Sequence, residues 1–347
     1  MFVKLPHISL FSIDWKASIP VLRYVFGSCF ILGVTALMNY DLAYLTSVLA
    51  LGFMAPGAKP LTIKQAASFI LILILITGTT VIFTELFLAY ALVFMPLLLL
   101  SLLWLYYTDK LPMVIKLFAL VSLIIIPFVS IDASAIGSYV SLRLVFNAFM
   151  AIILSQIVFW AFPLCEADIP FEKKKKEVQK QSESERFNYA LNIILLIMPV
   201  LVLFYLFKLS SSILILTFIA ILSISPALAN PKAGLVMVVA NVLGGIFGII
   251  AYKLLVMVPN FIFMILLALA IGLFFGNKLF SDHKYAGIFG TAFSTFLLIL
   301  GSVISSDAEA GSKVWSRVVQ IGIAVSYVVL AFGILNHILQ SKNKTRS

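Results

Sequence analysis

Long apolar runs constrain the fold of this sequence more than any other feature. Twelve of them follow one another along the 347 residues, separated by short polar or proline-containing turns. A bilayer core about 30 Å thick requires about 20 apolar residues for a spanning helix, whereas spanning β-strands would show alternating segments of about ten residues. No such alternation is present. We therefore expect an all-α integral membrane protein with about 12 transmembrane helices.

The composition supports a membrane protein and argues against a soluble one. A soluble fold of this length would need more polar surface than 63% hydrophobic and 11% charged residues can supply. A net charge of +10 could indicate nucleic-acid binding in a soluble protein, but in a membrane protein it is typical of cations retained on the cytoplasmic side. We expect the lipid bilayer as a partner and no nucleic acid.

The expected spans form two sets of six. The first set covers residues 17–38, 42–56, 62–84, 87–107, 112–130 and 139–163. One long kinked helix is an alternative for residues 65–108, where Glu85 is the one charged residue. The second set covers residues 187–207, 211–226, 232–257, 259–277, 284–304 and 314–339. The predicted organisation is a six-helix membrane repeat (1–164), a cytoplasmic charged linker (165–186), a second repeat (187–339) and a cytoplasmic tail (340–347).

A repeated polar segment suggests that the two sets are related. Asp132-Ala-Ser-Ala-Ile-Gly-Ser138 is followed after four residues by Arg143, and Asp307-Ala-Glu-Ala-Gly-Ser312 is followed after four by Arg317. Both termini in the cytoplasm would put 18 of the 24 Lys and Arg residues on that side, as the positive-inside rule favours. With six spans in each set, the repeats are parallel, and both Asp-Ala-x-Ala loops face outward.

Charged residues inside or beside the spans are the candidate substrate-pathway residues. A guanidinium at the bilayer centre costs about 2.5–3.5 kcal/mol on insertion scales, so function or pairing must offset it. In one interpretation, Arg143 and Arg317 line an outward vestibule that attracts an anion. In the other, Asp132 pairs with Arg143 and Asp307 with Arg317, which fixes each loop.

Two further charges have a functional and a structural interpretation. Arg23 either extends to the cytoplasmic headgroups along its apolar stem or lies at the inner mouth of a pathway. Glu85 either lies in a short outer hairpin or takes up and releases a proton during coupled transport.

Motifs for catalysis and cofactors are missing from the sequence. It has no Gly-x4-Gly-Lys loop, His-Glu-x-x-His motif or nucleophile elbow, and its three histidines are far apart. We expect no enzyme activity, catalytic residue, cofactor or metal site, and no transport driven by ATP hydrolysis in this chain. Gly244 with Gly248 and Gly272 with Gly276 have small-xxx-small spacing, which favours tight packing within the second half and is also compatible with a homo-oligomer.

The opening of the chain resembles a known family. Val21-Leu-Arg-Tyr-Val-Phe-Gly27, the segment 40–50 and Pro56-Gly57 resemble the start of the fusaric acid resistance and aromatic acid exporter family, and the Pro226 turn and the helix from Ala233 to Ile250 are similar in the second half. Members of that family have a Leu-Arg near the start of the first helix, and Arg23 is the matching arginine in this sequence. More distantly, the chain looks like the plant malate channels, which are built from similar six-helix units.

The resemblance implies a bacterial inner-membrane exporter of small, often aromatic carboxylic acids, which works with a periplasmic membrane-fusion adaptor. Larger members have bulky cytoplasmic domains after each six-helix block, and this sequence has only the linker and the tail. The leading hypothesis is therefore an exporter of small organic anions. The alternatives are a passive organic-anion channel, a non-transporting membrane scaffold and, third, a membrane-embedded enzyme.

Overall fold

The computed structural model describes residues 15–40, 42–108, 111–168, 183–208, 231–281 and 286–304, together with residues 319, 323 and 327. The described part of the chain is all-α. Its elements are α1 (Trp15–Met38), α2 (Tyr44–Phe53), α3 (Ile63–Phe87), α4 (Ala91–Tyr107), α5 (Met113–Val129), α6 (Ser134–Ala161), the 3-10 turn η1 (Glu166–Asp168), α8 (Glu183–Leu206), α10 (Pro231–Met257), α11 (Phe261–Leu279) and α12 (Ala286–Ile304).

The helices confirm a multi-pass membrane protein. Six of them are long and apolar enough to cross a bilayer, and four shorter helices are also apolar. Each of these ten helices coincides with one of the expected spans. The expected span 211–226 lies outside the described residues, and the span 314–339 is described at three positions only. The alternative of one long helix over residues 65–108 is wrong, because α3 ends at Phe87 and α4 begins at Ala91.

Helix α2 is shorter than the run that predicts it. Its ten residues extend about 15 Å, about half of a bilayer core. Pro56, Gly57 and Pro60 follow closely, and Gly57 has a φ of 72°, which interrupts a helix. Met54, directly after the helix, is buried. The non-helical backbone therefore begins against protein, where it is tolerated at membrane depth.

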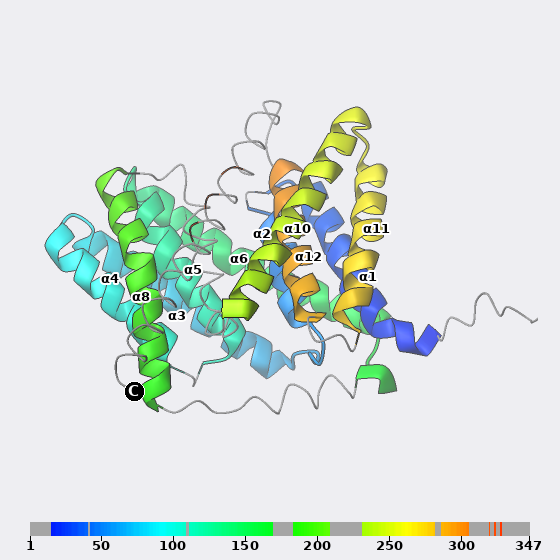
Figure 1. The fold of residues 1–347 in the computed structure, drawn as a ribbon, viewed down its shortest axis with the longest axis horizontal. Helices are drawn as coiled ribbons and strands as arrows, with labels where there is room; N and C mark the ends of the chain where they lie inside the picture. The colour runs from blue at the N-terminus through cyan, green and yellow to red at the C-terminus, as the bar shows by residue number, and fades with distance from the viewer. Residues whose placement is uncertain are drawn as a thin grey trace, which may run out of the picture.

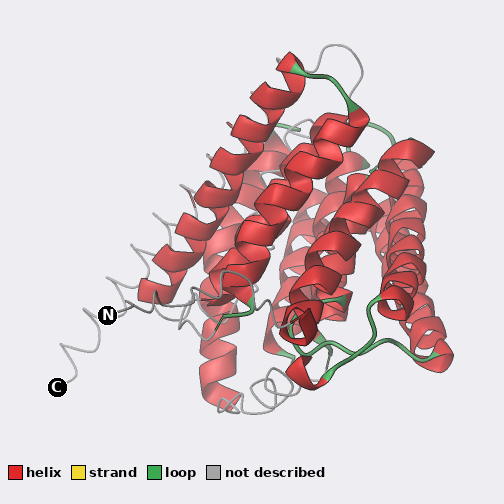
Figure 2. Cartoon of the chain, turned by 90° about the vertical axis from the view of Figure 1, so that its right-hand side faces the viewer, coloured by secondary structure: helices red, strands yellow, loops and turns green. Residues whose placement is uncertain are grey.

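The helices run side by side, and their connections gather at the two ends of the bundle (Figure 2). Arg23, near the start of α1, contacts the backbone just after α6, at Phe162. Tyr40, after the end of α1, packs edge-on against Phe146 near the middle of α6. Helices α1 and α6 are therefore antiparallel. We name the two ends of the bundle the Arg23 end and the Tyr40 end.

Two groups of helices lie on either side of α6 (Figure 1). Helices α3, α4, α5 and α8 form one group, and α1, α2, α10, α11 and α12 form the other. Helix α8 packs against α4, and α1 packs against α11. Each group therefore contains helices from both halves of the sequence.

The glycine pairs explain part of this packing. A Cβ atom at Gly244 would lie 2.2 Å from the carbonyl oxygen of Ala292, so α10 and α12 are in close contact, as predicted within the second half. A Cβ atom at Gly276 would lie 2.5 Å from Cγ2 of Val25. The prediction is therefore confirmed only in part for α11: a Cβ atom at Gly272 would lie 2.9 Å from Phe293 of α12, but both glycines of α11 also pack against α1 of the first half.

Candidate functional site

Arg23 forms a buried ion pair with Asp168 of η1. Its Nη2 atom donates to Oδ1 of Asp168, and Nη1 donates to Oδ2 at 3.3 Å. The side chains are only 2% and 4% exposed. Nη1 also lies 3.5 Å from the carbonyl oxygen of Phe162 and 3.4 Å from that of Pro163, and the guanidinium lies 4.9 Å from the ring centroid of Phe159. Its charge is therefore compensated on several sides.

This ion pair changes the interpretation of two segments. Arg23 does not extend to the headgroups, although its position near a span end predicts that. Asp168 belongs to the segment expected to be a solvated linker, but it is buried and also accepts the backbone N–H of Cys165 at 3.0 Å. A buried guanidinium requires a nearby carboxylate, and η1 brings Asp168 back against α1 to provide it.

Arg143 lies far from Arg23, toward the Tyr40 end. It is half-buried on α6, where its Nε donates to the hydroxyl of Tyr139 at 2.9 Å and its guanidinium lies 5.0 Å from that ring centroid. Arg23 and Tyr40 are separated by about 25 Å along α1 at 1.5 Å per residue. The structure therefore does not bring Arg23 and Arg143 into one site.

The loop that contains Asp132 lies between α5 and α6, at the Tyr40 end of the bundle. Asp132 is exposed just before α6, and Arg143 lies about 14 Å further along the axis than the first residue of that helix. Arg143 donates to Tyr139 of its own helix, and the pairing of Asp132 with Arg143 stays a prediction. Asp307 and Arg317 lie outside the described residues.

A chain of hydrogen bonds continues from Arg143 to α2. The side-chain amide of Asn147 donates to the carbonyl oxygen of Arg143 at 2.7 Å, and its oxygen accepts the hydroxyl of Thr46 at 2.6 Å. Tyr40 and Thr46 share a hydrogen bond of 2.7 Å. Sequence reasoning missed these three residues, although an asparagine in an apolar span is a signal that could have identified the first.

The charge of Arg143 is not neutralised by Tyr40. Burial raises the pKa of Tyr40, and this outweighs the opposite effects of the hydrogen bond to Thr46 and the nearby Arg143. The phenol is therefore neutral at pH 7, and the local charge stays positive.

A partly open apolar cavity of about 170 Å³ lies between α2, α5, α6 and α12. Val140 and Leu144 of α6 line it, and at 100° per residue they share one side of the helix with Arg143 and Asn147. Leu42 also lines it, with a strained φ of 61°. Arg143, Asn147, Thr46 and Tyr40, which we name the Arg143–Tyr40 polar cluster, are not among the residues that line this cavity, although Arg143 and Asn147 lie on the same side of α6 as two residues that do.

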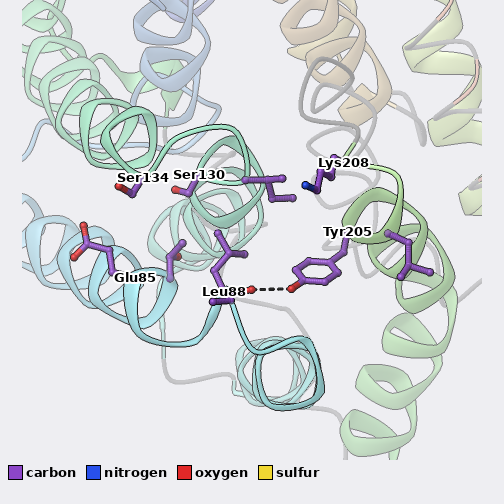
Figure 3. A pocket seen from close by; sticks show the side chains of 10 residues that line it. Glu85, Leu88, Ser130, Ser134, Tyr205 and Lys208 are labelled. Carbon is purple, nitrogen blue, oxygen red and sulfur yellow. Dashed lines mark hydrogen bonds between the residues drawn. The ribbon is translucent and has the colours of Figure 1, made fainter.

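A more open pocket of about 480 Å³ lies where α3, α5, α6 and α8 meet at the Tyr40 end (Figure 3). Glu85, in the last turn of α3, borders it on one side, and Lys208 borders it on the other. Ser130 and Ser134 contribute hydroxyls, and the Tyr205 hydroxyl donates to the carbonyl oxygen of Leu88 at 2.7 Å. Glu85 is exposed just before the short turn between α3 and α4, as the hairpin interpretation expects, and its role in proton exchange stays a prediction.

Comparisons of the chain with protein-family models, with curated proteins and with solved structures gave no match. The fold and the sites described above therefore carry the functional argument.

Proposed function

We propose that this protein is a membrane transporter that exports small organic anions, in particular aromatic carboxylates. Two observations support the proposal: the apolar cavity of about 170 Å³, and the Arg143–Tyr40 polar cluster, two of whose residues lie on the same side of α6 as residues that line the cavity. A cavity of this size suits a single aromatic ring, whose carboxylate could reach the guanidinium of Arg143. A charge-assisted contact of this kind is stronger than a neutral hydrogen bond and selects for anions.

We further propose 12 spans in two parallel six-helix repeats. In such a repeat, α1 corresponds to α8, α4 to α11, α3 to α10 and α5 to α12. The contacts support this correspondence, because α1 packs on α11 as α8 packs on α4, and α3 packs on α5 as α10 packs on α12. Helix α8 ends at the Tyr40 end while α10 begins at the Arg23 end, which is what a span over 211–226 requires. By the same symmetry, Asp307 and Arg317 would provide a second polar loop.

The charges support an orientation with the Arg23 end in the cytoplasm. Described cations besides Arg23 that lie there include Lys59, Lys64, Lys116, Arg186 and Lys278. Arg143, Lys208 and Lys253 lie toward the other end. By the positive-inside rule, we propose that both termini lie in the cytoplasm. With the resemblance to aromatic acid exporters, this favours a bacterial inner membrane and a periplasmic adaptor as a partner.

Flux through proteoliposomes tests the proposal. The purified protein should transport benzoate and related aromatic carboxylates, and it should discriminate against a neutral aromatic amide of the same size. Absence of flux with every organic anion, alone or with an adaptor, would refute the transporter. An anion conductance that is independent of a proton gradient, and unchanged in Glu85→Gln, would identify a passive channel instead.

A further inference from the structure

A larger cavity, about 760 Å³, lies at the Arg23 end and is not part of the proposed pathway. The end of α2, the following turn, the start of α3 and the start of α5 surround it. Its polar lining consists of Lys59, Lys64, Gln65 and Ser68. Among the described residues that line it, none carries a carboxylate. The electrostatic character of this opening is therefore positive.

The deeper lining of this cavity is apolar. Phe53 of α2, Phe69 and Ile72 of α3, and Val114 and Ile115 of α5 form it. The polar residues gather around the start of α3, and the apolar residues continue along the helices. The cavity is therefore amphipathic, with a cationic end and a hydrocarbon-like wall.

The geometry of α3 puts the cationic end at the level of the lipid headgroups. Lys64 is in the first turn of this 25-residue helix. The turn is fixed by a capping box, in which Thr62 Oγ1 accepts the N–H of Gln65 at 3.3 Å and Gln65 Oε1 accepts the N–H of Thr62 at 3.0 Å. Further along α3, Leu71 and Leu75 are exposed, as expected for side chains that face lipid. The cavity therefore lies beside a face of α3 that is suited to contact lipid.

We propose that this cavity binds an anionic phospholipid. The phosphate lies between the ammonium groups of Lys59 and Lys64, and the first part of an acyl chain follows Phe69 and Ile72. A free anion would use the lysines but would leave the apolar wall without a partner. Basic pockets between transmembrane helices have the chemistry that recognises acidic headgroups.

Native mass spectrometry of the full chain, with phosphatidylglycerol or phosphatidylcholine of the same acyl chains added, tests the proposal. Wild type should retain phosphatidylglycerol preferentially. Each cation near a membrane surface strengthens the binding of an anionic lipid about fivefold. Lys59→Gln/Lys64→Gln should therefore weaken the affinity for phosphatidylglycerol about 30-fold. The charge-matched control Lys253→Gln/Lys278→Gln should leave the affinity unchanged. Equal retention by wild type and the Lys59/Lys64 variant would overturn the proposal.

A steric variant separates a lipid from a free phosphate. Gly52 lines the cavity, and a Cβ atom there would meet only Cγ2 of Val114, at 3.9 Å, so Gly52→Leu can fold. The leucine should exclude the acyl chain and lower phosphatidylglycerol retention while both lysines remain. If the leucine has no effect, or if millimolar inorganic phosphate displaces the lipid, the site is a free-anion site and the lipid assignment is wrong.

Discussion

At the scale of single residues, Arg23 and Asp168 make the strongest electrostatic contact in the described part of the chain. Both side chains are almost completely buried, so neither charge is stabilised by water. Removing one partner of a buried pair leaves an uncompensated charge, which typically costs about 3–5 kcal/mol, whereas apolar replacement of both is often close to neutral.

Single and double substitutions at this pair should therefore differ in the size of their effect on stability. We expect Arg23→Met and Asp168→Leu to lower the melting temperature in detergent strongly, and the double variant to recover most of the loss. Glu183→Gln is the control, because Glu183 is exposed and its 3.9 Å contact with Arg186 contributes little. A double variant as unstable as the sum of the two single variants would contradict this account.

The pair also illustrates what could be predicted from sequence at this scale. Arg23 and Arg143 could be identified because each is a charge in an apolar run. Asp168 could not be identified as the partner of Arg23, since it is one of six acidic residues in a polar segment and the contact spans 145 positions. The apolar cavity could not be predicted either, because its walls come from four helices whose neighbours are set only by tertiary packing.

At the scale of helices, close approach between α1 and α11 depends on glycine. The space beside Gly276 is filled by Val25, a β-branched residue with little rotamer freedom. The apolar runs predicted the ten described helices, but they could not predict which helices become neighbours. They also predicted α2 too long, because hydropathy does not register where Pro56 and Gly57 end a helix.

Gly276→Leu should therefore destabilise the protein by about 1–3 kcal/mol or more through overpacking against α1. The matched control is Gly78→Leu in α3, where a Cβ atom meets no atom within 4 Å and helix propensity improves. Thermal unfolding in detergent measures both. Adding Val25→Ala should restore part of the stability of the Gly276 variant, and equal melting temperatures for both glycine variants would rule out this packing.

At the scale of the whole molecule, the two halves of the sequence are interleaved. Helix α1 is held by α11, and α8 is held by α4, so each helix group is assembled from both halves. The chain connection between the halves is not needed for these contacts once they have formed.

Cleavage between the halves should therefore leave the protein associated. A protease site inserted at Lys173–Lys176 and cut after purification should yield two fragments that co-elute in size-exclusion chromatography and retain flux. Gly276→Leu should weaken this association in the cut protein. Separation of the wild-type fragments on cutting would show that the halves are independent units.

The central claim is that Arg143 and the neighbouring apolar cavity bind an aromatic carboxylate during transport. Benzoate flux in proteoliposomes containing wild type, Arg143→Lys, Arg143→Gln or the control Lys253→Gln tests it most directly. Loss of a charge-assisted contact corresponds to about 10- to 100-fold, so flux per folded molecule should fall by that factor in Arg143→Gln, less in Arg143→Lys, and not at all in Lys253→Gln. Equal benzoate flux in wild type and a well-folded Arg143→Gln protein would contradict the account.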